Sequence, residues 1–349
     1  MSIYKNIVGN IRYKASPDSL VIKTIDMHTE GEPLRVIVSG FPELKGDTVL
    51  ERRVYLKEHL DQLRTSLMFE PRGHADMYGC ILTPPNTSES DFGIIFMHNE
   101  GYSTMCGHAT IAITKLAVEM GWVELQEPVT TIKIDAPCGQ LTAYAQVQKG
   151  VVTSVSFDNV PSFLFQKDLK LDLEGYGELK VDVAYGGAFY AFVNADEMGI
   201  EMVPSNINKL IKVGMDVKRA TQESIEVRHP FETDLSFLYG TIFTGKSLGN
   251  ADSRNVCIFA DGEVDRSPTG SGVSARMAIQ YAQGTMKIGD SMKIESILGS
   301  TFVGSIKETV DYGGLEAIIP NVAGTAFITG QHEFIIDPQD PMKDGFILR

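Results

Sequence analysis

Short apolar runs separated by turn residues recur along the whole chain and predict its strands. Alternating or continuous apolar positions indicate strands over residues 21–27, 34–38, 77–82, 94–97, 131–134, 141–147 and 151–157, and then over 180–193 (two strands around a glycine turn), 255–260, 292–297, 301–306 and 315–319. Apolar residues spaced by three and four indicate helices over residues 50–68, 111–120, 207–221 and 273–282. Strands and helices mixed in this way are typical of an α/β or α+β protein.

The same sequence landmarks occur twice, in the same order. A Cys-Gly pair at 106–107 and a Thr-Gly pair at 269–270 each stand where a predicted helix begins, and each helix stops at a glycine 15 residues after the first residue of the pair, at Gly121 and Gly284. Such a repeat predicts two pseudo-symmetric α/β halves related by an approximate two-fold axis. Two further landmarks recur: a glycine turn before the pair (Gly31; Gly186-Gly187) and an Asn-Val dipeptide 53 or 52 residues after its first residue (159–160; 321–322).

The length of 349 residues also favours two domains over one. We place the first half at residues 1–175, which carry Cys106, and the second at residues 176–325, which carry Thr269. The C-terminal residues 326–349 either extend the second half or cross back onto the first. The repeat directs both helix starts into one cleft, so we expect an interdomain active site. The alternative is two unrelated domains in which the glycines coincide by chance.

The net charge indicates which classes of partner to exclude, and the cysteines indicate the cellular compartment. The formal net charge of −14 disfavours nucleic acid and anionic membrane surfaces. No apolar stretch approaches the ~20 residues of a membrane span, and the N-terminus has no continuous apolar core of a signal peptide. The four cysteines are widely spaced without a Cys-x-x-Cys pair, so we expect free thiols and a cytoplasmic location.

Cys106 is the first candidate for chemistry because it precedes the predicted helix over residues 111–120. A thiol at a helix N-terminus lies against unpaired backbone N–H groups and the positive end of the helix dipole. Both favour the thiolate, which suits a base or a nucleophile. The small neighbours Gly107 and Ala109 leave room for an anion such as a carboxylate to reach those N–H groups. The alternative is that Cys106 is a small buried hydrophobic residue.

The repeat adds a second helix N-terminus on the other side of the cleft. Cys106 and Thr269 would then face opposite sides of the carbon that bears a bound carboxylate. Two bases that flank an α-carbon can racemise it without a cofactor, one removing the proton and the other returning it. The helix ends would stabilise the enolate-like charge that develops on the carboxylate. We expect the carboxylate to accept hydrogen bonds from the N–H groups of Gly107, His108, Gly270 and Ser271.

Several segments of the chain resemble the proline racemase family. The most specific are Met105-Cys-Gly-His-Ala109 and Asp265-Arg-Ser-Pro-Thr-Gly270. In racemases and 4-hydroxyproline epimerases of this family a second cysteine follows Asp-Arg-Ser-Pro, whereas this chain has Thr269. The subgroup with threonine at that position is similar to trans-3-hydroxy-L-proline dehydratases. Three further segments carry the resemblance: His28-Thr-Glu-Gly-Glu-Pro33, Glu70-Pro-Arg-Gly-His74 and Ala184-Tyr-Gly-Gly187.

The resemblance implies the two-domain fold of diaminopimelate epimerase and proline racemase, with the active site between the domains. It also implies a homodimer, a hydroxyproline-like imino acid as the substrate, and neither a cofactor nor a metal. His108 and Asp265 are expected to contact the substrate, Asp265 at the ring ammonium.

The threonine changes the reaction that this resemblance implies. A threonine hydroxyl is far too weak an acid to shuttle protons near pH 7 as a thiol does, so racemisation should fail. A substrate with a leaving group on the β-carbon can still react: Cys106 takes the α-proton, the 3-hydroxyl leaves as water, and the enamine tautomerises to Δ1-pyrroline-2-carboxylate. We expect Thr269 to hydrogen-bond either the substrate or the departing hydroxyl.

Two other functions fit the same scaffold. One is a proline racemase or hydroxyproline 2-epimerase in which water or another side chain replaces the second thiol, and the other is a non-catalytic protein that binds proline-like ligands. Gly270-Ser-Gly272 lacks the acidic strand end of a dinucleotide site, no cluster has zinc spacing, and no lysine has a pyridoxal context. We leave out the loop histidines His28 and His74, and we assign Cys80, Cys138 and Cys257 to core packing.

Overall fold

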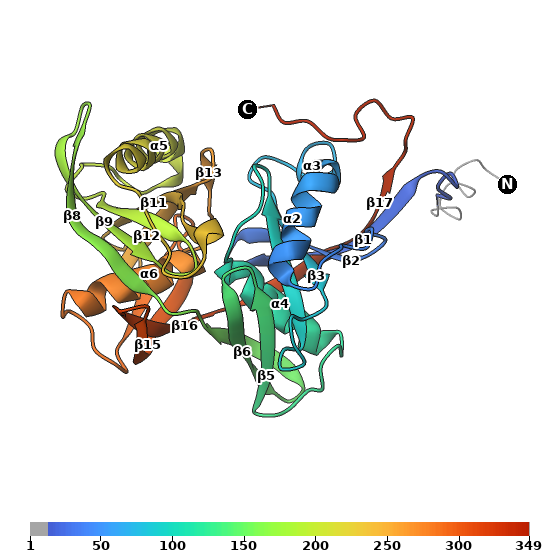
Figure 1. The fold of residues 1–349 in the computed structure, drawn as a ribbon, viewed down its shortest axis with the longest axis horizontal. Coiled ribbons are helices and arrows are strands. Elements are labelled where there is room, and N and C mark those ends of the chain that lie inside the picture. Colours follow the sequence, from blue (N-terminus) through green and yellow to red (C-terminus); the bar gives the residue numbers. More distant parts are fainter. Residues whose placement is uncertain (1–12, 349) are drawn as a thin grey trace.

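The computed structural model describes residues 13–348, so residues 1–12 and Arg349, which the predicted first half and C-terminal segment include, lie outside the described residues. The strands and helices gather in two lobes, shown side by side in Figure 1. The first lobe holds β1 (Leu20–Thr29), β2 (Glu32–Ser39), α2 (Val49–His59), α3 (Asp61–Met68), β3 (Tyr78–Thr83), β4 (Phe92–His98), α4 (Gly107–Glu119), β5 (Val129–Ala136), β6 (Gly139–Gln148) and β7 (Val151–Asp158). The rest of the chain forms β8 (Phe163–Leu173), β9 (Gly177–Tyr185), β10 (Phe189–Asn194), the 3₁₀ helix η1 (Pro204–Asn206), α5 (Ile207–Ser224), the 3₁₀ helix η2 (Thr233–Leu235), β11 (Leu238–Gly245), β12 (Ser253–Phe259), β13 (Glu263–Val264), α6 (Gly270–Ala282), β14 (Ser291–Glu295), β15 (Thr301–Tyr312), β16 (Leu315–Gly324) and β17 (Ala326–Ile336).

The pairing of neighbouring strands repeats in the two halves. The pairs β1–β2, β3–β4, β5–β6 and β6–β7 are antiparallel, and β2–β3 and β4–β5 are parallel. In the second half, β9–β10, β11–β12, β14–β15 and β15–β16 are antiparallel, and β10–β11 and β12–β14 are parallel. The order of parallel and antiparallel pairs is therefore the same, which confirms the predicted pseudo-symmetric α/β repeat.

Each half packs its strands around one helix. α4 contacts β1, β6 and β7, and α6 contacts β9, β15 and β16. Most residues of both helices are buried, as expected for a helix that is stable only inside a core. Each helix ends at a glycine with positive φ, Gly121 (67°) and Gly284 (72°), the conformation that glycine adopts most readily. Among residues 13–348, no helix has both the length and the apolar character needed to cross a membrane.

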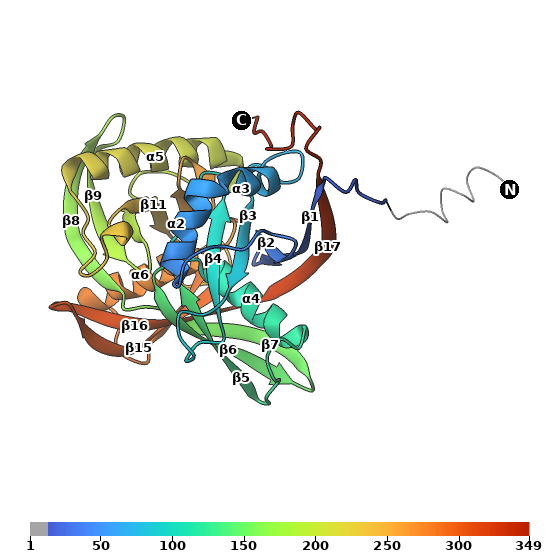
Figure 2. The same cartoon turned by 45° about the vertical axis from the view of Figure 1, so that its right-hand side comes forward.

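Two strand pairings connect the halves. β7 pairs antiparallel with β16, so the two Asn-Val dipeptides of the repeat lie near each other, and the Asn159 N–H donates to the Pro320 carbonyl (2.9 Å). β17 leaves the second half and pairs with β1 along its whole length (Figure 2). It thus occupies beside β1 the position that β8 occupies beside β9. The borders at residues 175 and 325 stay predictions.

The structure corrects the predicted elements in several places. The helix predicted over residues 50–68 is two helices, α2 and α3, because the backbone of Leu60 leaves the helical conformation (φ −134°, ψ 14°). α6 begins at Gly270, directly after Thr269, rather than at residue 273. The apolar pattern predicts none of β8, β11 and β17. Exposed polar residues fill much of β8 and β17, and glycines interrupt β11, so none of the three has the signature of a strand.

Candidate active site

Cys106 occupies the N-cap position of α4. Its backbone is extended (φ −147°, ψ 107°), and its Sγ accepts a hydrogen bond from the Ala109 N–H (3.4 Å). His108 lies in the first turn of the helix and brings its Nδ1 to 3.1 Å from the same sulfur. The start of α4 therefore holds a thiol and an imidazole in contact, beside N–H groups that have no acceptor within the helix.

Thr269 occupies the equivalent N-cap position of α6 in a different backbone conformation. Its φ of 65° and ψ of 95° lie in a region that β-branched residues rarely adopt. The preceding loop is held in place because the Ser267 N–H donates to Asp265 Oδ1 (2.7 Å) and the Thr269 N–H donates to Ser267 Oγ (3.2 Å). Within the described part of the chain, the buried Thr269 Oγ1 has no hydrogen-bond partner. A bound molecule that supplied one would remove an energetic cost.

The two helix N-termini meet at Gly107 and Gly270. A Cβ atom on Gly107 would lie 2.5 Å from the Gly270 Cα, and one on Gly270 would lie 2.7 Å from the Gly107 Cα. Beside this contact lies a cavity of about 20 Å³, about the room that one water molecule needs. The cavity is lined by Glu32, Tyr78, Met105, Cys106, Gly107 and His108 from the first half and by Tyr190, Tyr239, Cys257, Phe259, Asp265, Thr269, Gly270 and Ser271 from the second.

The cavity brings together all seven residues predicted for the site, whose catalytic and binding roles stay predictions. Seven other residues also line it. Glu32 lies in the His28–Pro33 motif, and membership of that motif is a signal that identifies it. Cys257 is fully buried in β12, as its assignment to the core requires, but it also faces the cavity. The aromatic residues carry no signal in the sequence because tyrosine and phenylalanine are common in buried strands.

Burial outweighs the helix N-terminus in setting the pKa of Cys106. Burial raises the pKa of the thiol well above its usual value, although the Ala109 N–H and the Tyr78 hydroxyl lower it. The nearby carboxyl groups of Asp265 and Glu32 raise it further. In this closed arrangement, burial therefore opposes the thiolate that the helix N-terminus favours.

The other titratable groups of the cavity also have shifted pKa values. Burial lowers the pKa of His108 to about 3, so its ring is neutral and only a weak base. Burial raises the pKa of Glu32 well above its usual value, and the charge of Asp265 adds to this shift. Burial raises the pKa of Asp265 as well, but Ser267, whose N–H donates to Asp265 Oδ1 (2.7 Å), opposes the change. The cavity thus offers a neutral imidazole next to Cys106 and a pair of carboxyl groups in unlike surroundings.

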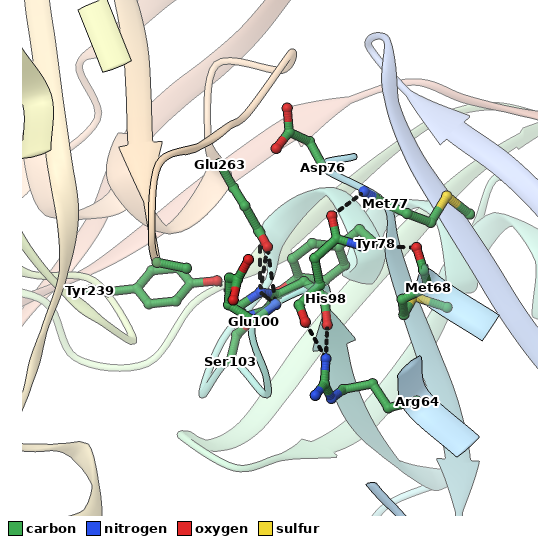
Figure 3. Close-up of polar contacts among 12 residues, drawn as sticks. Arg64, Met68, Asp76, Met77, Tyr78, His98, Glu100, Ser103, Tyr239 and Glu263 are labelled. Atoms are coloured by element: carbon green, nitrogen blue, oxygen red, sulfur yellow. Dashed lines mark hydrogen bonds and ion pairs between the residues drawn. The ribbon is translucent and has the colours of Figure 1, made fainter. Parts of the chain in front are cut away.

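Serine hydroxyls hold the tyrosines that line the cavity. The Ser103 Oγ is hydrogen-bonded to the Tyr78 hydroxyl of the same half and to the Tyr239 hydroxyl of the other half (3.1 Å). The Tyr190 hydroxyl is hydrogen-bonded to Ser271 Oγ in the first turn of α6 (2.7 Å). Figure 3 shows Tyr239 reaching towards Ser103 from the second half. These hydrogen bonds position the walls of the cavity and join the two halves.

A buried contact between a histidine and a glutamate forms a second polar contact between the halves. His98, at the end of β4, places Nδ1 3.1 Å from the carboxylate of Glu263 in β13, and the Glu100 N–H donates to the same carboxylate (3.2 Å; Figure 3). Neither His98 nor Glu263 lines the cavity. This pair therefore contributes to closing the halves on each other rather than to the surface that a ligand would contact.

The side chains of the cavity suit proton transfer next to a carboxylate. Between residues 13 and 348, no three His, Cys, Asp or Glu side chains are grouped so as to hold a metal ion. The starts of α4 and α6 offer N–H groups for an anion. Cys106 and His108 lie at one of these helix starts and can remove a proton from the carbon beside that anion.

The sequence profile of proline racemase matches residues 24–347. The chain belongs to the proline racemase family. It is 51% identical over 331 residues to the trans-3-hydroxy-L-proline dehydratase of Colwellia psychrerythraea, which covers 95% of this chain and 93% of that protein. It is 45% identical over 329 residues to the 3-hydroxyproline 2-epimerase of Burkholderia multivorans, covering 94% of this chain and 98% of that protein.

A solved structure of the same family has the same fold. The crystal structure of a hydroxyproline epimerase from Agrobacterium vitis, with bound trans-4-hydroxy-L-proline, matches with a TM-score of 0.88 and 33% identity over 94% of this chain and 96% of that chain. These similarities confirm the resemblance and the fold predicted from the sequence. Because dehydratases and epimerases both occur among the relatives, identity alone does not decide the reaction, and the residues of the cavity must be considered.

Proposed function

We propose that this protein is a trans-3-hydroxy-L-proline dehydratase, a lyase that removes water from its substrate without a cofactor. The observation that carries the proposal is the unlike pair at the two helix N-termini, Cys106 on α4 and Thr269 on α6, which approach the cavity from opposite halves. The similarity to the dehydratase of Colwellia psychrerythraea, at 51% identity, supports the same reaction.

The substrate is held by its carboxylate and its ring nitrogen. The carboxylate accepts hydrogen bonds from the N–H groups of Gly107, His108, Gly270 and Ser271, which have no acceptors within their own helices. The positive ends of both helix dipoles stabilise the same anion. Asp265 takes the ring ammonium, since a buried carboxylate in this cavity would otherwise lack a cationic ligand.

The reaction begins at the α-carbon. Cys106 loses its own proton to solvent while the halves are apart and then removes the α-proton, while the helix N–H groups stabilise the enolate-like charge on the carboxylate. The bond between C3 and oxygen breaks, the hydroxyl leaves as water, and the enamine tautomerises to Δ1-pyrroline-2-carboxylate. Thr269 is too weak an acid to return a proton to the other face, so the substrate does not epimerise.

Substrate binding requires the two halves to separate. The closed cavity has a volume of about 20 Å³, which is about the room for one water molecule and far too small for a pyrrolidine ring with a carboxylate. We assign the moving units to residues 1–175 together with 326–349 and to residues 176–325. Opening would also expose Cys106 to solvent, which removes the burial that raises the pKa of its thiol.

The proposal is tested by offering three imino acids to the purified protein in D₂O without added cofactor. Proton NMR would follow trans-3-hydroxy-L-proline, trans-4-hydroxy-L-proline and L-proline. We expect the first to become Δ1-pyrroline-2-carboxylate and the other two to keep their configuration. No turnover of the 3-hydroxy compound would contradict the proposal, and ligand binding that persists without turnover would instead indicate a binding protein.

One observation favours an epimerase as the second candidate. Cys257 lines the cavity from the half that carries Thr269, so a second thiol is present there. Burial raises the pKa of Cys257 well above its usual value, so in the closed state it favours the protonated thiol, as it does for Cys106. An epimerase would introduce deuterium at the α-carbon of trans-4-hydroxy-L-proline with inversion, and Cys257→Ala would abolish that inversion.

We also propose that the enzyme is a cytoplasmic homodimer. The dimer follows from the family resemblance, and light scattering after size-exclusion chromatography would then give about twice the 38.3 kDa of one chain. The location is supported by the four cysteines, all buried and free of disulfide bonds, which is typical of a reducing compartment. Cell fractionation tests the location.

A further inference from the structure

Dehydration at C3 needs an acid as well as a base, because a hydroxyl group leaves readily only when it is protonated. In trans-3-hydroxy-L-proline the hydroxyl lies on the ring face opposite the carboxylate, which is the face that carries the α-proton. The base and the acid must therefore approach the same face of the ring. Cys106 is the base in the proposed function, on which this inference rests, so the acid must come from the side of the cavity that holds Cys106. Thr269 approaches the other face and cannot protonate the hydroxyl.

Apart from Cys106, the first half lines the cavity with three titratable side chains, Glu32, Tyr78 and His108. His108 is neutral because burial lowers its pKa to about 3, and a neutral imidazole is a poor proton donor. The Tyr78 hydroxyl is bonded to Ser103, and burial raises its pKa well above its usual value. Glu32 is the carboxyl group that remains.

Glu32 reaches the cavity with one oxygen anchored and the other without a partner. It is the first residue of β2 and its side chain is fully buried. Its Oε2 accepts a hydrogen bond from the Arg266 N–H (2.7 Å) and lies 3.4 Å from Nη1 of the same residue. Its Oε1 is buried and has no hydrogen-bond partner among residues 13–348. A proton on Oε1 would therefore be available to a group inside the cavity.

Glu32 and Asp265 form a pair of carboxyl groups in unlike surroundings. Burial and the charge of Asp265 raise the pKa of Glu32 well above its usual value, although the charge and hydrogen bonds of Arg266 oppose the change. Burial also raises the pKa of Asp265, but Ser267, whose N–H donates to Asp265 Oδ1 (2.7 Å), favours its anion. Two close carboxyl groups do not both ionise readily, so the surroundings assign the charge to Asp265 and the proton to Glu32. The anion suits the ring ammonium, and the acid suits the leaving hydroxyl.

We propose that Glu32 is the catalytic acid that protonates the departing 3-hydroxyl. The Cys106 thiolate takes the α-proton, and the electron pair of that bond forms the double bond between Cα and Cβ. The bond between C3 and oxygen breaks, and the oxygen takes the proton of Glu32 Oε1 and leaves as water. Glu32 ends as a carboxylate beside Arg266 and Cys106 ends as a thiol. One proton passing from the thiol to the carboxylate through solvent, after product release, restores the enzyme.

The test separates protonation of the leaving group from every other role of Glu32. Glu32→Gln keeps the size of the side chain and an acceptor for the Arg266 N–H but removes the acid. With trans-3-hydroxy-L-proline we expect kcat to fall by ~10²–10⁴-fold, the usual contribution of a general acid. With trans-3-chloro-L-proline, chloride leaves without a proton, so the rate of the variant should stay within about threefold of the wild-type rate.

Glu263 is the matched control. Like Glu32 it is a fully buried glutamate that crosses between the halves, where it meets His98, but it does not line the cavity. Glu263→Gln should therefore lower the unfolding temperature without changing the ratio of the hydroxy rate to the chloro rate. Glu32→Asp keeps an acid on a shorter side chain and should recover part of the lost hydroxy rate. This second variant distinguishes a missing proton from a folding defect in Glu32→Gln.

Each outcome decides the proposal. A Glu32→Gln enzyme that is slowed equally on both substrates would mean that Glu32 only positions the loop carrying Asp265 and Thr269, which overturns the proposal. Wild-type dehydration by Glu32→Gln would place the acid elsewhere and overturn it too. Failure of the wild-type enzyme on trans-3-hydroxy-L-proline would instead contradict the proposed function, and that measurement precedes any variant.

Discussion

Replacement of Gly107 by alanine tests whether catalysis requires the two helix N-termini to touch. The Cβ that Gly107→Ala introduces would lie 2.5 Å from the Gly270 Cα and 3.1 Å from its carbonyl carbon. Both are backbone atoms, so no side-chain rotation relieves the collision. Ordinary contact begins at 3.4 Å, so the helix starts must separate by about 0.9 Å before the halves can close.

This displacement is large for an active site whose rate depends on the alignment of the reacting groups. A misplacement of 1 Å can cost about 10²-fold in rate, equivalent to about 2.7 kcal/mol of activation free energy. We therefore expect Gly107→Ala to lower kcat/KM by about 10²-fold for dehydration. The fold should survive, because alanine at a helical position is preferred over glycine by roughly 0.5–1 kcal/mol.

The assay combines initial rates, followed by proton NMR of the product, with thermal unfolding of the same samples. Gly121→Ala is the matched control, since Gly121 ends the same helix with φ 67° and has no neighbour within 4 Å. That substitution should lower the free energy of unfolding by about 1–2 kcal/mol through its left-handed backbone and leave kcat/KM unchanged. Wild-type kcat/KM in Gly107→Ala would refute the reasoning, because the helix starts would then not need to meet.

Three further predictions follow from the cavity and from one buried ion pair. Thr269→Cys places a thiol on the face opposite Cys106. We expect this variant to epimerise trans-4-hydroxy-L-proline, measured as deuterium at the α-carbon with inversion. No epimerisation would contradict the proposal that Thr269 prevents it because its hydroxyl is too weak an acid. Alkylation of Cys106 should abolish dehydration, and full activity after stoichiometric modification, mapped by mass spectrometry, would exclude it as the base. Arg254, together with nearby donors, overcomes burial and lowers the pKa of Glu295 from 4.5 to about 2. Because the folded pKa is depressed, this stabilisation of about 3 kcal/mol is present above pH 4.5 and is lost as the pH falls towards 2. In urea unfolding at pH 7, Glu295→Gln should lose this stabilisation from the free energy of unfolding. Glu178→Gln, which removes one side of the exposed pair with Lys170, should leave the free energy of unfolding almost unchanged. Equal effects of the two substitutions would argue against the pKa shift of Glu295.

The features that could be predicted from the sequence are those set by local pattern. The repeat is visible because the same requirement occurs twice: a small residue where each helix starts and a glycine where it ends, at Gly121 and Gly284. Motif residues likewise identify Cys106, Asp265 and Thr269 without coordinates. The strands β8 and β17 escape prediction because exposed polar residues hide their period of two.

The chemistry of the cavity depends on contacts between residues far apart in the chain. Glu32 meets Arg266 more than 200 positions away, and Cys257 joins the site from β12, which contacts the loop before α6 through Asn255 and the Pro268 carbonyl. The sequence shows the helix N-terminus, which favours the Cys106 thiolate, but not the burial that opposes it. Local sequence determined the glycines at which α4 and α6 end and the residues with reactive groups. Tertiary structure alone decided which of those groups share one cavity and which hold a proton, because burial and the distance between charges exist only once the two halves have closed.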